Sequence, residues 1–595
     1  MVKKIADDKN TAIIIFVAVV CINIISILKF GDNIGLYLDA VNPDYLATKL
    51  VNPNSLTGSW TLPYIGIPLL GQAYHGTLTM IGSYFSILIT GTTSVMQLRV
   101  VNSVYSALAV VIIYKIFDRL NVKKKLSVAI CLLITLSPNV IGTYFTQYYI
   151  ELPGVALFLA MCYGLIKWKN DNENLLLLLR CGLYGGLAFY DYFNFLFFLP
   201  GAMLIVIFVS ILSNKKRTFE NSVVFIVGYA YGTLPYILGY SGMLLCQISS
   251  INELQRRLAQ GGITILVIGM LYVIYTLQKY IDKRRRVVSV LMLCAGALGG
   301  LLLGVFVLKK YDWYFQGLNV SGTEGGLYTR IKLIVEYLKQ VLLHSSLEYL
   351  VIRENFGHGL VIVPLLTVVT SITAVWIYRI NGARVDKNKI YVIIAFYMSV
   401  CCYLLCCVIL ATRMQGQHFV PMMFIMYIIL GLSIAVIFEY FNSNQYVNIC
   451  LGLGLVLTLT IFMTRESQIE ARAKSIARID TNFNQLYSNA IEKMAEEALQ
   501  NKERGEKEYY IFPQWGMLCG FDYLTQNSVC FTDTIDLDQL RWLRDDLDYE
   551  IVVCYWDEDN SSVYENLLYQ VFPEGGFNKK IVNGNYGEIY EICVE

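Results

Sequence analysis

Two aspartates near the start of the chain are the first residues whose type and setting could carry chemistry. Asp39 and Asp44 follow the first long apolar run by a few residues. A carboxylate at a membrane surface can deprotonate an acceptor hydroxyl or bind a divalent metal ion such as Mg²⁺ or Mn²⁺. Asp44 also follows an Asn-Pro turn and could instead cap the next helix. Asp39 could be a solvated loop acid.

Two further acids and the histidines extend this set. Glu151 stands at the mouth of an apolar run and Asp191 at a turn between two such runs, where an acid is costly unless it is wet or paired. Glu151 could join Asp39 and Asp44 as a metal ligand. His75 and His418 fall on the same side as the acids, and so do the other two histidines, His344 and His358. The histidines lack zinc-type spacing, so we expect no zinc site.

Several cations are predicted on that side as well. A donor phosphate would need one or two of them, and a contact with lipid headgroups is the alternative. The candidates are Arg99, Arg330, Lys332, Arg353 and Arg413.

Composition and apolar runs predict the helices that must position these residues. The chain is 56% hydrophobic and only 15% charged, whereas soluble proteins carry about 25% charged residues. Its apolar runs predict a polytopic α-helical membrane protein with about thirteen transmembrane helices, at 11–30, 99–117, 126–145, 152–168, 174–189, 191–213, 222–243, 261–278, 287–308, 358–378, 389–411, 418–438 and 446–464. The net charge of +2 and the lack of a long basic stripe argue against a nucleic-acid partner.

Basic loops predict the orientation. Clusters around 119–125, 215–217, 279–286 and 379–389 all fall on one side with Lys3 and Lys4. The positive-inside rule then places the N-terminus inside and the C-terminus outside. Residues 63–92 would break this agreement as a span, so we interpret them as an interfacial or re-entrant outer segment.

Two domains follow from this reading. Residues 1–464 form the transmembrane part, with outer loops at 31–98 and 309–357. Residues 465–595 form a small extracytoplasmic α/β domain. Its expected strands begin at Tyr509, Tyr549 and Tyr586, and its expected helices cover 536–546 and 561–571.

Four stretches resemble the C-type membrane glycosyltransferases of family 39, which include protein O-mannosyltransferases and aminoarabinose-transferase-like enzymes. The first is the acidic loop, 39–50. The second, 74–78 with 97–103, is similar to the family's Leu-Arg-Leu-Pro entry to span two. The third, 151–157 with 185–192, is similar to its Asp-Ala-Pro-Leu-Ala and Gly-Leu-Ala-Phe-Leu-Thr-Lys runs, and the fourth, 417–421, to its late Arg-Tyr-x-x-Pro run.

The resemblance implies a catalytic role for the acidic loop. Members transfer a sugar from a polyprenyl-phosphate carrier to an acceptor outside the membrane, with one carboxylate as base. Asp39 or Asp44 would be that base, and we favour Asp39 because Tyr45, Ala47 and Leu50 fit the family's helix after the acid, with a short insertion between them. The family's acids are adjacent, whereas these are five positions apart. A lysine of the family is replaced by Asp191 and its neighbour.

The resemblance also implies partners. These are a polyprenyl-phosphate sugar donor, membrane lipid, and an extracytoplasmic glycan, lipid or protein acceptor, with a bacterial plasma membrane as the setting. Substrate contacts would come from His75, Arg99, Glu151, Asp191, Arg330 and His418. A transporter or lipid-linked-glycan flippase is the alternative, but few mid-span charges and no inverted repeat are visible. A membrane scaffold whose tail binds a partner is a third reading.

Overall fold

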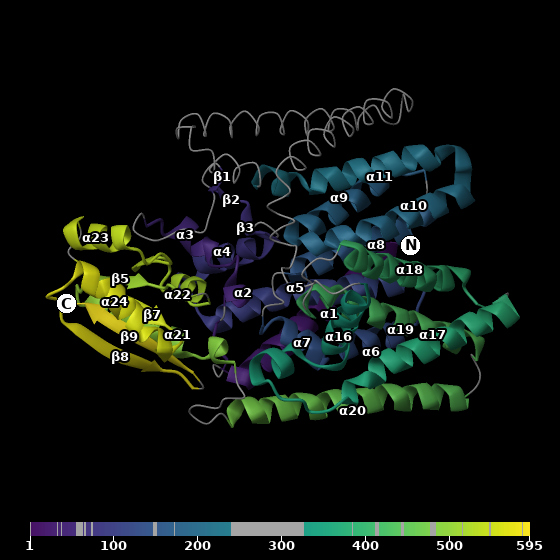
Figure 1. The fold of residues 1–595 in the computed structure, drawn as a ribbon. Helices are drawn as coiled ribbons and strands as arrows, with labels where there is room; N and C mark the ends of the chain where they lie inside the picture. Colours follow the sequence, from purple (N-terminus) through teal and green to yellow (C-terminus); the bar gives the residue numbers. More distant parts are fainter. Residues whose placement is uncertain are drawn as a thin grey trace.

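The computed structural model shows a helical bundle with a small sheet domain at one end (Figure 1). It describes residues 2–31, 34–36, 38–54, 63–64, 67–72, 75–146, 151–171, 173–239, 327–382, 385–410, 416–441, 445–475, 484–514, 516–546, 549–585 and 587–594.

Eight helices of the described part are long and apolar enough to cross a membrane. Each exceeds the roughly 20 residues that a bilayer core requires, or comes within a residue or two of it. The prediction of a polytopic α-helical membrane protein is therefore confirmed. The eight are Asn10–Phe30 in α1 (Val2–Phe30), Val95–Arg119 (α5), Leu152–Asn170 (α8), Phe193–Ser213 (η3 and α10), Gly359–Asn381 (η6 and α17), Lys387–Ile409 (α18), Gly416–Tyr440 (η8 and α19) and Gln445–Lys474 (α20).

Five other predicted spans are not among these eight. Three correspond to shorter helices, namely α6 (Lys124–Thr135) with α7 (Pro138–Thr143), α9 (Leu175–Asp191) and α11 (Thr218–Gly232). The remaining two, 261–278 and 287–308, lie outside the described residues. The number thirteen and the side of each terminus stay predictions.

Helix α9 packs unusually close to α11. A Cβ atom added at Gly182 would lie 2.1 Å from the carbonyl oxygen of Phe225, and one added at Gly228 would lie 2.1 Å from that of Leu179. Small residues let helix backbones approach in this way. This contact fixes α9, whose last residue is Asp191.

Basic loops meet at one end of the bundle. Lys123 lies over the ring of Phe438, with the ammonium 5.8 Å from its centroid. The Lys169 ammonium donates to Asn388 over 2.8 Å, and Lys389 forms an ion pair with Glu439 at 2.6 Å. The candidate site residues lie at the opposite ends of these helices.

The opposite end carries short elements between α1 and α5. Two small helices, α2 (Leu38–Val41) and α3 (Leu46–Val51), come first. Two hairpins pair β1 (Pro63–Tyr64) with β2 (Ile67–Pro68) and β3 (Leu70–Gln72) with β4 (His75–Gly76). Helix α4 (Leu78–Thr90) is apolar but has 13 residues, about 20 Å in length, which is too short to cross a bilayer.

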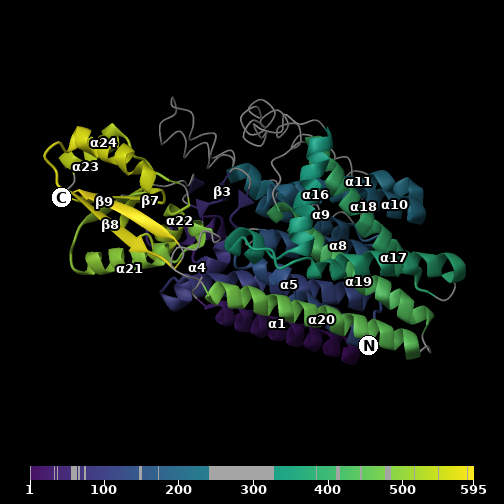
Figure 2. The ribbon, with the colours of Figure 1, turned by 60° about the horizontal axis from the view of Figure 1, so that its bottom comes forward.

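The C-terminal domain is a five-stranded sheet with the order β6-β5-β7-β9-β8. Figure 2 shows three of these strands, β7, β8 and β9, beside helices α21, α22, α23 and α24. Strands β6 (Cys530–Thr532), β5 (Glu508–Ile511) and β7 (Glu550–Tyr555) are parallel, whereas β9 (Glu588–Val594) and β8 (Phe577–Asn583) run antiparallel to their neighbours. The helices are α21 (Ala490–Glu503), α22 (Leu518–Leu524), α23 (Leu537–Asp546) and α24 (Ser561–Val571). The predicted small α/β domain is confirmed.

Candidate active site

The acidic loop places Asp44 in the protein interior. Asp44 is fully buried, and its Oδ1 accepts a hydrogen bond from the hydroxyl of Ser83 in α4. Helix α3 has Tyr45 at its N-cap and no side-chain cap hydrogen bond. The idea that Asp44 caps this helix is therefore wrong, because its carboxylate turns toward α4. Asp39 lies in α2, and its side chain is outside the described residues.

Burial tunes the acidity of Asp44. Removal from water raises the pKa of its carboxyl to about 7, while the side chains of Ser83, Thr79 and Asn102 oppose this rise. Its Oδ2 has no hydrogen-bond partner in the described part of the chain. A carboxylate that is held by Ser83 and has a pKa near neutrality is suited to accept a proton at physiological pH.

Four site residues form a continuous row. The ring of His75 stacks on Tyr192, with centroids 6.4 Å apart and an interplanar angle of 4°. Tyr192 also contacts His418 at 5.3 Å between centroids. The Nδ1 of His418 lies 3.3 Å from Oε1 of Glu151. Three predicted residues far apart in the sequence are thus brought together by a tyrosine that was not predicted.

His75 is neutral in this setting. Burial lowers the pKa of its imidazole to about 4, and the nearby carbonyl of Gly76 only partly opposes the change. A neutral imidazole can donate or accept a hydrogen bond, so His75 contributes no positive charge toward a phosphate at neutral pH.

Glu151 and Asp191 meet at the start of α8. The Asp191 Oδ2 accepts a 2.6 Å hydrogen bond from the backbone amide of Gly154, which satisfies a free N–H group at this helix start. Burial, with the charge of Asp191, raises the pKa of the Glu151 carboxyl well above its usual value. Among the described residues, Oε2 of Glu151 has no hydrogen-bond partner.

Two of the predicted arginines, Arg99 and Arg330, lie outside this row, and Arg413 is outside the described residues. The guanidinium of Arg99 is fully buried, donates to the carbonyl oxygens of Ile34 and Gly31, and lies over the ring of Phe145 at 4.8 Å. It fastens the end of α1 to α5. Arg330 lies in α16 (Leu327–Leu343), and its Nη1 is 3.5 Å from the carbonyl oxygen of Val408.

No metal centre is evident in the described part of the chain, where no group of three or more His, Cys, Asp or Glu could hold an ion. The side chain of Asp39 is not part of that comparison. A divalent cation held by Asp39, Asp44 and Glu151 stays a prediction.

The C-terminal domain packs directly on the acidic loop. Asp522 in α22 is fully buried, and its Oδ1 accepts a 3.1 Å hydrogen bond from Thr48. Its Oδ2 lies 3.5 Å from the ammonium of Lys49. Burial, and after it the charge of the nearby Asp44, raises the pKa of the Tyr523 phenol. The sequence signalled neither contact, because the partners lie hundreds of positions apart.

Comparisons with known proteins bear on the region around this site. Residues 83–238 match the family described as dolichyl-phosphate-mannose-protein mannosyltransferase. This segment contains Ser83, Glu151 and Asp191. Among solved structures, the chain is similar to the oligosaccharyltransferase of Archaeoglobus fulgidus in complex with Zn and sulfate, with 12% identity and a TM-score of 0.42 over 95% of this chain and 72% of that chain. No curated protein matches.

The family match confirms two predictions made from the sequence. The chain resembles glycosyltransferase family 39, and it is an enzyme that transfers a sugar. Eight candidate spans make it a multi-pass membrane protein.

Proposed function

We propose that this family-39-like membrane glycosyltransferase moves a sugar from a polyprenyl-phosphate donor to an acceptor at the outer membrane surface, with a carboxylate of the acidic loop as base. The observation that carries the proposal is the setting of Asp44. Its carboxylate is buried, held on one side by Ser83, and burial brings its pKa to about 7.

The reaction is a single displacement. The base takes the proton of the acceptor hydroxyl while that oxygen bonds to the anomeric carbon. The bond between this carbon and the phosphate oxygen breaks, and the phosphate leaves on the carrier lipid. One displacement inverts the anomeric configuration, which requires one base rather than the two closely spaced carboxylates of a retaining enzyme.

His418 and Arg330 are the proposed contacts of the leaving phosphate. Helix α16, which carries Arg330, packs against η8 (Gly416–Phe419), which carries His418. The Nε of Arg330 is buried and has no hydrogen-bond partner within the described residues. Arg99 acts differently in this proposal, because its donors are engaged by backbone carbonyls that shape the loop before Asp39.

The basic loops support the outward direction of the site. Those at 119–125 and 379–389 gather at the end of the bundle opposite Asp44, whereas the cluster at 279–286 lies outside the described residues. Basic loops favour the cytoplasmic side. The proposed setting is a bacterial plasma membrane, and the acceptor is a glycan, lipid or protein outside the cell.

Transfer from defined donors tests the proposal. Purified protein in proteoliposomes receives radiolabelled polyprenyl-phosphate hexoses and pentoses together with an envelope extract as acceptor. Asp44→Asn and Asp39→Asn are compared with Asp171→Asn, a matched acid at the basic end of the bundle. Loss of the base should lower the rate about 10²- to 10⁴-fold. Wild-type rates in both loop variants would remove the acidic loop from the mechanism.

A further inference from the structure

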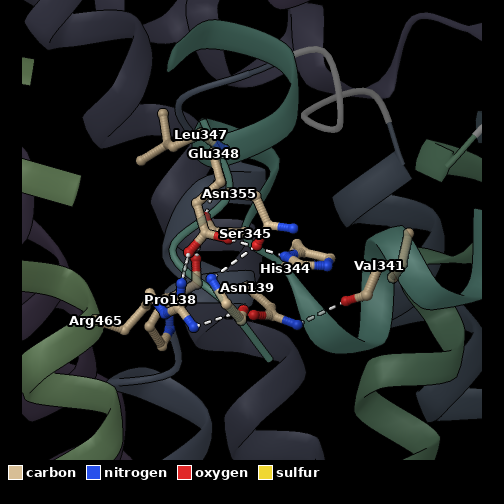
Figure 3. Close-up of polar contacts among 10 residues, drawn as sticks. Pro138, Asn139, Val341, His344, Ser345, Leu347, Glu348, Asn355 and Arg465 are labelled. Carbon is tan, nitrogen blue, oxygen red and sulfur yellow. Dashed lines mark hydrogen bonds and ion pairs between the residues drawn. The ribbon is translucent and has the colours of Figure 1, made fainter. Parts of the chain in front are cut away.

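A second buried polar cluster lies beyond the row of His75 and His418. Glu348 is 1% exposed and lies between two cationic or polar groups, as Figure 3 shows. Its Oε1 is 3.4 Å from Nη1 of Arg465, and its Oε2 is 3.3 Å from Nδ1 of His344. Arg465 also donates to the carbonyl of Gly357 over 2.8 Å. A buried carboxylate is stable only with such partners.

Glu348 orients His344. When Nδ1 carries the proton, it donates to the carboxylate and leaves Nε2 as an acceptor. The ring of His344 is in edge contact with that of His358 at 5.5 Å between centroids. The carboxylate therefore presents an imidazole with a fixed hydrogen-bonding pattern.

The backbone around Glu348 is also unusual. It belongs to a π-helical turn, η5 (Leu347–Ile352), and such turns are frequent at functional sites. The turn ends at Arg353, whose φ of 55° is in the left-handed region that non-glycine residues seldom adopt.

These residues line a cavity of about 390 Å³, within the range of roughly 300–1,000 Å³ typical of small-molecule sites. Its lining consists mostly of polar side chains that donate and accept hydrogen bonds, together with an aromatic ring. They include Gln340, His344, Glu348, Tyr349, Arg353 and Asn355.

The charges of the cavity disfavour an anion. Three acids line it, namely Glu336, Glu348 and Glu354, against the two strong cations Lys339 and Arg353. Each acid lies beside a cation, at 3.5 Å for Glu336 and Lys339 and 2.6 Å for Glu354 and Arg472. A phosphate would meet three carboxylates, of which Glu336 and Glu354 already pair with Lys339 and Arg472, whereas uncharged hydroxyl groups can use both donors and acceptors.

The cavity lies at the end of the bundle that carries the candidate active site. Helix α16, at whose end it lies, packs against η8 with His418. Next to the cluster, the hydroxyl of Thr146, a residue a few positions before Glu151, donates to the hydroxyl of Ser346 over 3.0 Å. The cavity therefore lies at the same end of the bundle as Asp44.

We propose that this cavity is an acceptor subsite that binds a hydroxyl-rich, uncharged sugar unit through His344, Arg353 and Asn355. The assignment rests on the proposed function, because a transferase needs a second substrate site beside its base. It names the acceptor class as a saccharide.

Binding by the whole protein tests this without turnover. Saturation-transfer NMR is recorded on the protein in lipid nanodiscs, which avoid sugar-headed detergents, with glucose, mannose, N-acetylglucosamine and maltose as probes. Arg353→Ala and Asn355→Ala change exposed residues and are combined. Arg541→Ala, at an exposed arginine of α23 in the C-terminal domain, is the control. We expect saturation of at least one sugar, weakened about tenfold or more by the double change, as loss of two hydrogen bonds implies.

Two results would overturn the assignment. One is the absence of sugar binding, or binding unchanged in the double variant. The other is preferential binding of inorganic phosphate, followed by ³¹P line broadening in a separate sample. Failure of this proposal and failure of the proposed function give different results. Normal sugar binding without transferase activity in wild type would contradict the transferase alone, whereas normal transfer without binding at the cavity would contradict the subsite alone.

Discussion

Asp522→Ala should loosen the acidic loop, because Asp522 is a buried contact between that loop and the C-terminal domain. Its carboxyl accepts from Thr48 at 3.1 Å and faces Lys49 at 3.5 Å. The side chain of Lys49 is only 14% exposed, so it cannot fully rehydrate when its partner is removed.

The size of the effect follows from these contacts. Removing one partner of a buried ion pair costs about 3–5 kcal/mol. Two features reduce this. Burial raises the pKa of Asp522 to about 7, so near pH 7 the carboxyl is only about half ionised. Thr48 also retains the carbonyl of Tyr45 as an acceptor at 2.6 Å. We therefore expect about 2–3 kcal/mol for alanine.

Asparagine should cost less. Asp522→Asn fills the same space and keeps an acceptor for Thr48, and it resembles the protonated carboxyl that burial already favours. A loss of about 1 kcal/mol or less is expected. Asp538→Ala in α23 is the control, because its side chain is 97% exposed in a surface pair with Arg541 and such pairs contribute little.

Hydrogen–deuterium exchange of the amides in 38–51 measures the change. Exchange through local opening should accelerate about 30- to 150-fold in the alanine variant, since 1.4 kcal/mol corresponds to a factor of ten. Exchange equal to that of the Asp538→Ala control would refute the role of Asp522. Equal damage in the asparagine and alanine variants would refute the argument that the neutral carboxyl suffices.

Three further predictions concern other parts of the chain. If Asp44 is the base, kcat/KM should rise with pH and level off above about 7, because burial raises its pKa to that value and only the ionised form accepts a proton; a rate independent of pH between 5.5 and 9 contradicts this assignment. Gly182→Ala should lower the thermal stability by about 1–3 kcal/mol, since its Cβ would lie 2.1 Å from the Phe225 carbonyl oxygen, whereas Gly452→Ala in α20 meets nothing within 4 Å and should not. Arg330→Ala should raise KM for the lipid donor about tenfold or more with little change in stability, as the loss of one charged hydrogen bond implies; an unchanged donor KM contradicts the proposed phosphate contact.

Local patterns were enough to predict much of the fold. The spans at 11–30 and 389–411 are runs of apolar residues whose length alone matches a bilayer, and α1 and α18 correspond to them. The predicted helix at 561–571 coincides with α24. Helices depend mainly on neighbouring residues, so a single sequence carries their signal. The short hairpins around His75 have no such pattern and were not predicted.

The candidate site was predictable in part for a topological reason. Glu151, Asp191 and His418 each stand at the end of a helix on the same side of the bundle, so counting spans was enough to bring them near each other. Their contacts were not predictable. The Tyr192 ring that joins His75 to His418 and the Ser83 hydroxyl on Asp44 depend on how helices rotate about their axes, which is decided by packing between distant segments.

Arg99 shows the same limit. Its position at the mouth of a span suggested a phosphate contact. In the structure, its guanidinium instead donates hydrogen bonds to the carbonyl oxygens of Gly31 and Ile34. A charged side chain that follows an apolar run looks the same in sequence whether it binds a ligand or the backbone. Only the partner, 65 or more positions away, distinguishes the two.

The position of Asp44 depends on parts of the chain outside its own loop. Helices α2 and α3 have only four and six residues, and helices this short are not stable alone in water. Their place is set by α4 on one side, through Ser83, and by α22 on the other, through Asp522. A base must be held within a fraction of an ångström of its productive geometry to be effective. The C-terminal domain is therefore part of what positions the proposed base, since it supplies one of the two surfaces that hold the loop.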